Sequence, residues 1–200
     1  MSKKELILIA ALRAIGEKGY AGLTMALVAK YAEIGKSTLY EYFDSKETLV
    51  MEATVFFAKE FIERIHKDSW ESGTDYETIL KVSIAKMMTA LGSEFADHDS
   101  FLNGVTQMDY CEKTKDAYMQ AMKPVIEKAS AYTKRLITLG QEDGVLRPDI
   151  DDVDIFITQR MIIFLAASFL RNDVSDDIIA NLDETSIIQY IYNYITKALN

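Results

Sequence analysis

The chain has 200 residues, of which 22 are basic and 31 acidic, so its formal net charge is −9. This length is enough for one or two domains with a hydrophobic core that needs no disulfide or metal to hold it. A single cysteine, Cys111, excludes an intrachain disulfide framework and an all-cysteine metal site, and two histidines make a histidine-rich metal site improbable. The total charge alone argues against a nucleic-acid partner, so the distribution of the charge has to be considered.

No apolar run reaches the roughly 18 residues that a membrane span requires, and the best candidate, 161–170, is too short. The N-terminus resembles a signal peptide superficially, but it lacks a small-residue cleavage site. Arg13 and Glu17 continue its periodic pattern, which therefore predicts a first helix. We expect a cytoplasmic protein with no membrane partner, which agrees with one free thiol.

Apolar residues recur at helical spacing through most of the chain, and no segment alternates as a strand would. The sequence therefore predicts an all-α protein of about nine helices. In chain order they cover about 3–18, 24–31, 36–42, 45–67, 75–91, 101–110, 114–142, 152–171 and 185–199, with a polar loop over 94–100. Gly19 should end the first helix, Thr24 and Ser45 should cap two others, and Pro124 should kink or break the long one.

Charge is distributed unevenly along this series of helices. Residues 1–50 hold seven basic and six acidic side chains, whereas residues 51–200 hold 15 basic and 25 acidic ones. The N-terminal quarter is therefore close to neutral and compatible with a phosphate backbone, while the remainder is acidic.

Two short helices joined by a tight turn at 33–35, after a supporting helix, describe a helix-turn-helix unit. Ala29 is small where two helices must cross, and Ile34, Leu39 and Phe43 are apolar where the third helix must pack. The side chains left to face a major groove are Lys36, Ser37, Thr38, Tyr40, Glu41 and Tyr42. Thr24, Tyr42 and Lys46 stand at helix ends, where they can hold phosphates.

These residues resemble a known family. The run Thr38-Leu39-Tyr40-Glu41-Tyr42-Phe43-Asp44-Ser45-Lys46-Glu47-Thr48-Leu49, preceded by Glu17-Lys18-Gly19-Tyr20, Leu23-Thr24 and Val28-Ala29, looks like the DNA-binding domain of TetR-type transcriptional regulators. The resemblance covers about residues 5–50. It implies a DNA-binding domain over 1–48 and a helical effector-binding and dimerisation domain over 49–200, which matches the family in layout only.

The sequence departs from the family pattern at three positions of the helix-turn-helix unit. Glu33 occupies the turn position usually held by glycine, where a left-handed backbone costs a non-glycine residue about 1–2 kcal/mol. Gly35 replaces the usual serine cap, and Ser37 replaces a glycine. Glu41 either accepts from a cytosine amino group or, as we favour, points to solvent. The operator sequence therefore stays open.

The middle helices are rich in methionine and aromatic side chains, which pack as ordinary core or line an effector pocket, as the resemblance implies. The candidate lining residues are Trp70, Met87, Met88, Phe95, Phe101, Met108, Tyr110, Tyr118 and Met122. Such a lining suits an apolar or amphipathic ligand. Glu94, Asp97, Asp99 or Asp109 would favour a cationic ligand if they faced inward. Glu94, Asp97, His98 and Asp99 could be imagined as a metal site, but a solvated acidic loop is the simpler interpretation.

The last two helices are the candidate dimer interface, because each has a broad apolar surface. The residues expected there are Phe156, Met161, Ile163, Phe164, Ala167, Ile187, Tyr190, Ile191 and Tyr194. Two such helices from each subunit would form a four-helix bundle, as the resemblance implies.

Together these patterns predict a ligand-responsive, homodimeric DNA-binding regulator, most simply a repressor, with no cofactor, no metal and no catalytic residue. Gly35-Lys36-Ser37-Thr38 resembles the end of a phosphate-binding loop, but Lys30 stands where its first glycine should be. Cys111 is either a packing residue or a thiol sensor. The alternatives are a small helical enzyme and a protein-interaction module.

Overall fold

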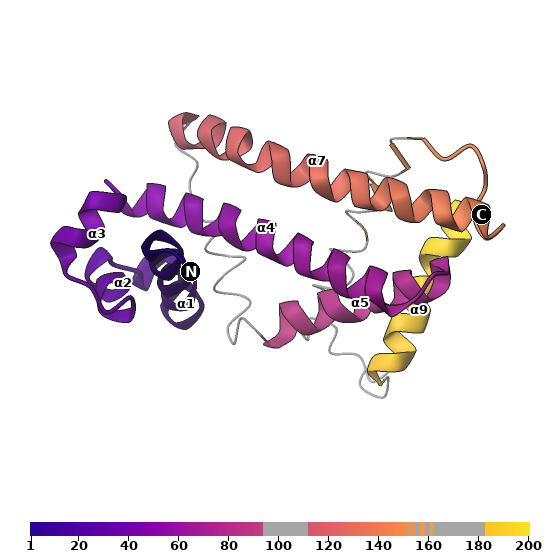
Figure 1. Cartoon of the computed structure of the whole chain (residues 1–200), viewed down its shortest axis with the longest axis horizontal. Coiled ribbons are helices and arrows are strands. Elements are labelled where there is room, and N and C mark those ends of the chain that lie inside the picture. Colours follow the sequence, from indigo (N-terminus) through magenta and orange to yellow (C-terminus); the bar gives the residue numbers. More distant parts are fainter. Residues whose placement is uncertain (94–111, 152, 155–156, 159–160, 162–182) are drawn as a thin grey trace. The chain divides into compact units, whose positions relative to one another are not determined.

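The computed structural model describes residues 1–93, 112–151, 153–154, 157–158, 161 and 183–200 (Figure 1). These residues form seven helices and no strand, so the all-α prediction is confirmed at the level of the fold class. The helices are α1 (Lys3–Gly22), α2 (Met25–Tyr31), α3 (Lys36–Tyr42), α4 (Lys46–Ser72), α5 (Tyr76–Ser93), α7 (Glu112–Glu142) and α9 (Glu184–Leu199). The expected helix at 101–110 lies outside the described residues, as does most of the one at 152–171.

The chain divides into two compact units. The first consists of Met1–Phe61 and Phe95–Val125, and the second of Ile62–Glu94 and Ile126–Asn200. Both α4 and α7 therefore contribute to each unit.

Helix α1 is closed at both ends by local hydrogen bonds. Ser2 and Glu5 form a capping box, in which the Glu5 amide donates to the Ser2 hydroxyl at 3.2 Å and the Ser2 amide to the Glu5 carboxylate at 2.8 Å. Near the other end Gly19 takes a φ of 65°, and its carbonyl accepts from the Leu23 amide at 3.1 Å. The prediction was that Gly19 ends the helix. Gly19 does leave the helical conformation for one that favours glycine, but α1 continues beyond it to Gly22.

The turn between α2 and α3 has the geometry of a helix-turn-helix unit. The Thr24 hydroxyl accepts from the Leu27 amide at 3.2 Å, which confirms Thr24 as the N-cap of α2. Glu33 has a φ of 54°, so the left-handed position is kept although it holds glutamate. The Ile34 amide donates to the Ala29 carbonyl at 3.0 Å, and Gly35 caps α3 without a side chain.

One apolar core fixes the position of α3 within the first unit. Its fully buried members come from α1, α2, α3 and the first turns of α4, and include Ile7, Ala11, Ile15, Val28, Leu39, Phe43, Leu49, Val50 and Ala53. The predicted domain boundary at residue 48 thus falls inside α4, just before three residues that belong to the N-terminal core. The Ser45 hydroxyl accepts from the Thr48 amide at 3.1 Å and caps α4 as expected.

The second unit is built around α5, α9 and the C-terminal part of α7. Its core includes Tyr76, Leu80, Ile84, Met88, Ile137, Leu146, Ile191, Ile195 and Leu199. Helix α4 extends to Ser72, beyond the expected end at residue 67, and α7 passes through Pro124 as one continuous helix, so a break there is not observed.

The segment after α7 fastens the C-terminus of α9. Gly144, with a φ of 70°, ends α7, and the Val145 and Leu146 amides both donate to the Gly140 carbonyl. The Arg147 amide then donates to the carbonyl of Leu199 at 3.1 Å, and its guanidinium pairs with Asp154. This segment therefore gives the last helix an anchor within its own unit.

Candidate nucleic-acid interface and effector region

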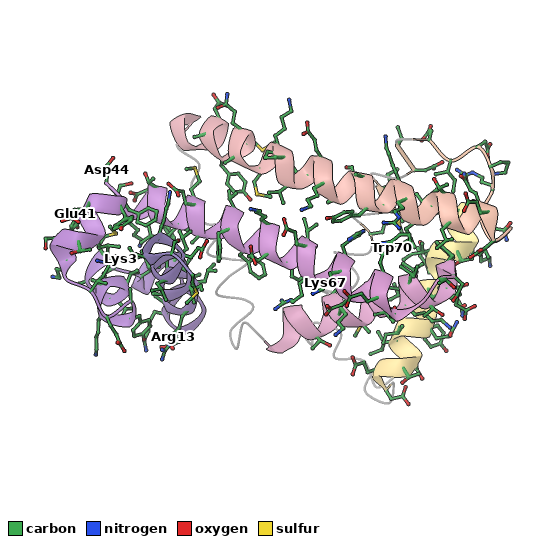
Figure 2. All side chains as sticks on the ribbon, viewed as in Figure 1. Lys3, Arg13, Glu41, Asp44, Lys67 and Trp70 are labelled. Atoms are coloured by element: carbon green, nitrogen blue, oxygen red, sulfur yellow. The ribbon has the colours of Figure 1, made fainter. Side chains whose placement is uncertain are left out.

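Helix α3 has one buried face and one polar face. Leu39 and Phe43 are at most 1% exposed and hold the inner face against the core. The predicted DNA-contacting side chains lie on the other face: Lys36, Ser37, Tyr40, Glu41 and Tyr42 are exposed, and Thr38 is half-buried. Figure 2 shows Glu41, and Asp44 just after the helix, on the side of α3 that faces away from α1. The structure therefore brings the predicted recognition residues together on one surface.

The residues expected to hold phosphates differ in how far their polar groups are already bonded within the protein. Thr24 is exposed, and because its oxygen accepts from Leu27, its hydroxyl hydrogen stays available to a phosphate. Tyr42 is 40% exposed at the end of α3. Lys46 differs, because its Nζ donates to the Tyr20 carbonyl at 2.6 Å and lies 4.1 Å from the centre of the Tyr20 ring.

A second polar cluster joins α1 to α2. The Tyr31 hydroxyl donates to Glu17 at 2.5 Å, and Arg13 Nε donates to the same carboxylate at 2.8 Å. These two hydrogen bonds, the one from Tyr31 first, lower the pKa of Glu17. The i, i+4 spacing of Arg13 and Glu17 is visible in the sequence, but no pattern could have placed Tyr31 beside them.

The predicted effector residues are divided between the two units and the part of the chain that the structure does not describe. Trp70, Met87 and Met88 belong to the second unit, and Tyr118 and Met122 to the first. Met88 is 6% exposed and packs in the core of its unit. Phe95, Phe101, Met108 and Tyr110 lie outside the described residues, as do Cys111 and the loop over 94–100.

The first unit does contain a groove of about 530 Å³ that the sequence did not indicate. Its apolar lining includes Leu8 of α1, Met51 and Phe56 of α4, and Ala121 of α7. Beside them, Lys4 of α1 and Glu52 of α4 form an ion pair of 2.5 Å. None of the predicted effector residues that the structure describes lines this groove.

Within the second unit, α4 and α7 face each other through three side-chain pairs. Lys128 bonds Glu63 at 2.6 Å, the rings of His66 and Tyr132 stack with centres 3.4 Å apart, and the Arg135 guanidinium lies 3.7 Å from the centre of the Trp70 ring. Burial, and then the charges of Arg135 and Lys128, lower the pKa of His66. Its Nε2 is buried without a hydrogen-bond partner among the described residues.

The described residues of the predicted dimer interface differ in exposure. Tyr190 and Tyr194 are 61% and 58% exposed on α9, and Ile187 is half-buried. Ile191 is 2% exposed and packs in the core of its own chain. Met161 is half-buried, whereas Phe156, Ile163, Phe164 and Ala167 lie outside the described residues.

Neither a metal cluster nor a membrane span is found in the described part of the chain. No three side chains of histidine, cysteine, aspartate or glutamate come together there in a way that could hold a metal ion. No described helix is both long enough and apolar enough to cross a bilayer.

Comparison with known proteins identifies the helix-turn-helix unit. Residues 7–53 match the family described as bacterial regulatory proteins, tetR family. The match spans the part of α1 after Leu6, all of α2 and α3, and the first turns of α4. Residues 7–53 therefore form a DNA-binding domain of the TetR type. The family resemblance predicted from the sequence is therefore confirmed.

Two relatives match the chain over most of its length. It is 25% identical to the uncharacterized HTH-type transcriptional regulator YhgD of Bacillus subtilis, over 100% of this chain and 98% of YhgD. It is also 25% identical to the fatty acid metabolism regulator protein of the same species, over 87% of each chain. Both relatives are named as regulators.

Solved structures share the fold. FadR from Bacillus subtilis, solved in complex with stearoyl-CoA, superposes with a TM-score of 0.70 at 21% identity, over 98% of this chain and 99% of FadR. FadR from Bacillus halodurans gives a TM-score of 0.72 at 21% identity, over 98% and 95% of the two chains. At this level of identity the match shows a common fold and nothing about the ligand of the present chain.

Proposed function

We propose that the protein acts in the cytoplasm as a homodimeric, ligand-responsive regulator that binds a near-palindromic operator, most simply as a repressor. The observation that carries this proposal is the polar outer face of α3, which is held by Leu39 and Phe43 in a single buried core. A rigid recognition helix is what sequence readout requires. Two copies of α3 would enter successive major grooves about 34–36 Å apart.

In this proposal the side chains of α3 have two roles. Lys36, Ser37 and Thr38 start the helix and would approach base edges, with Tyr40 and Glu41 one turn further along. Thr24 and Tyr42 would hold phosphates on either side, because each presents a hydroxyl at a helix end. The enzyme and protein-docking alternatives lack a comparable observation.

We further propose an amphipathic effector of the long-chain fatty acyl type, either an acyl-CoA or a free fatty acid. Two observations support this class: one relative is a fatty acid metabolism regulator, and the FadR structure of the same fold contains stearoyl-CoA. Methionine and aromatic side chains on the middle helices suit an acyl chain. The effector would weaken operator binding by about 1–3 kcal/mol of coupling free energy, transmitted by α4, which runs from Lys46 to Ser72.

Selection of bound sequences from a random duplex pool tests the proposal directly. We expect a palindromic consensus, and we expect stearoyl-CoA or stearate, but not free coenzyme A, to release the selected DNA. Tyr42→Ala should weaken binding to every sequence, because a phosphate contact carries no sequence information. If no DNA is enriched, the protein-docking alternative is favoured, and turnover of the acyl ligand would indicate an enzyme.

A further inference from the structure

The contact between Lys46 and Tyr20 points to a role that the sequence did not indicate. Lys46 is the first residue of α4, and Tyr20 lies 26 positions earlier, in the last turn of α1. The distance from Lys46 Nζ to the Tyr20 carbonyl oxygen is 2.6 Å, which is a short, charge-assisted hydrogen bond. The ammonium also lies 4.1 Å from the centre of the Tyr20 ring, within the range of a cation–π interaction.

The Tyr20 carbonyl is one of the last groups of α1, and such groups lack partners inside their own helix. The Leu23 amide satisfies the neighbouring Gly19 carbonyl, and Lys46 satisfies that of Tyr20. Helix α1 has no basic residue of its own in its last turn, so Lys46 also supplies the positive charge that a helix C-terminus favours. A side chain from α4 thus completes the C-terminal cap of α1.

This cap lies at the segment that connects α1 to α2 and therefore helps to position the helix-turn-helix unit. The segment from Gly19 to Thr24 contains the left-handed glycine and the N-cap of α2, and α2 leads directly into α3. A second ion pair, between Lys4 and Glu52, joins the N-terminal end of α1 to the second turn of α4. Helix α4 is therefore fastened to both ends of α1, and through Tyr20 to the α1–α2 corner.

We propose that Lys46 is a positioning residue, not a phosphate contact: it locks the start of α4 to the α1–α2 corner, so that α4 and the recognition helix move together. The proposal rests on the proposed operator binding by α3. It names the contact through which a movement of α4 would reach that helix. A movement of α4 would then rotate the three-helix unit as one body. The contacts of Lys46 and Lys4 and the shared core prevent α3 from moving separately from α4.

The salt dependence of operator binding separates this role from a phosphate contact. Lys46→Met keeps the apolar stem beside Tyr20 and removes the ammonium. We expect the full-length variant to bind the selected operator about tenfold more weakly, as for the loss of one charge-assisted hydrogen bond, with the slope of log K against log salt unchanged. Lys46→Arg should restore the affinity. Lys59→Met, the same change at an exposed position of α4, is the matched control and should bind as the parent does.

A slope that is shallower by about 0.9 for each lysine removed would show that Lys46 contacts phosphate and would overturn the proposal. Unchanged affinity in Lys46→Met would also overturn it.

A measurement without DNA makes the result independent of the proposed function. In the free protein, amide hydrogen exchange at Leu23 should be faster in Lys46→Met than in the parent or in Lys59→Met, because the α1–α2 corner loses its fastening. Equal exchange in all three proteins would contradict the positioning role, even if the protein bound no DNA. Failure of the parent protein to bind any selected DNA, with faster exchange in Lys46→Met, would instead contradict the operator proposal alone.

Discussion

At the scale of single residues, the helix-turn-helix unit contains one strained position. Glu33 has a φ of 54°, where a β-carbon crowds the backbone, and it is the one non-glycine residue with positive φ among those described. The strain is tolerated because the Ile34 and Glu33 amides donate to the carbonyls of Ala29 and Lys30 and so fix the turn. The resemblance to the family indicated this strain, since the family pattern places glycine there.

Replacing Glu33 with glycine should stabilise the protein. The strain is worth about 1–2 kcal/mol, and the added freedom of glycine in the unfolded chain offsets about 0.5–1 kcal/mol of it. We expect the free energy of unfolding to rise by about 0.5–1 kcal/mol, measured by urea denaturation of the full chain. Glu33→Ala keeps the β-carbon and is the control. An equal rise in the free energy of unfolding of both variants would show that the effect comes from removal of the carboxylate rather than from relief of backbone strain.

His66 makes stability depend on pH. Its pKa in the folded protein lies below the ordinary 6.5, because burial disfavours the imidazolium and because Arg135 and Lys128 repel it. The unfolded chain binds the proton more readily, so the free energy of unfolding should fall as the pH drops from 6.5 through the folded pKa. His66→Phe keeps a ring against Tyr132 and removes the titration. Denaturation between about pH 5 and pH 8 should therefore give a flatter profile for this variant, and parallel profiles would contradict the assignment.

At the scale of secondary-structure elements, two helical glycines make a matched pair. A β-carbon at Gly140 in α7 would lie 2.7 Å from Leu146 Cδ1 and 2.8 Å from Tyr76 Cδ2, whereas one at Gly16 in α1 would have no neighbour within 4 Å. Close packing, not backbone conformation, therefore requires glycine at residue 140.

Alanine should consequently have opposite effects at these two positions. Gly16→Ala should raise the free energy of unfolding by about 0.5–1 kcal/mol, because alanine favours a helix interior. Gly140→Ala should lower it by about 1–3 kcal/mol, because α5 and the segment after α7 must shift. Thermal or urea denaturation measures both. A stabilised Gly140→Ala variant would show that the approach of Leu146 to α7 is looser than described.

Helices defined by local signals could be predicted from the sequence, whereas contacts between elements could not. Thr24 and Ser45 cap their helices as expected, because a cap depends on residues three positions apart. A kink or a break was predicted at Pro124, and the break was wrong, since a proline signal is local and the surrounding helix overrides it. Lys46 was assigned to phosphate from its position at a helix end, and its bond to Tyr20 depends on how α1 and α4 pack.

At the scale of the whole molecule, the net charge of −9 does not exclude DNA, because residues 1–50 are close to neutral and the acidic excess lies beyond them. In a dimer the acidic parts would repel a phosphate backbone over about a Debye length, near 10 Å at 0.1 M salt. Non-specific binding should therefore be weak, while operator binding depends on a few contacts at α3. The protein is suited to a selective operator rather than to general coating of DNA.

Pairing of the recognition helices requires a dimer, and we propose that α9 contributes to its interface. Tyr190 and Tyr194 are exposed one turn apart, while another side of α9 packs in its own unit through Ile191, Ile195 and Leu199. Two large exposed aromatic residues on one helical face are typical of an interface. We therefore expect the parent chain to sediment as a dimer at micromolar concentration.

Tyr194→Glu should shift this equilibrium toward monomer, because a carboxylate would be buried without a partner at the interface. Asn193→Glu adds the same charge at the neighbouring exposed position of α9, outside the predicted interface, and should leave the dimer intact. Analytical ultracentrifugation of both variants, with operator binding measured in parallel, checks the prediction. A monomeric parent chain, or equal weakening by both substitutions, would show that α9 does not pair through this face. Another dimer interface would then be required to place two copies of α3 on one operator.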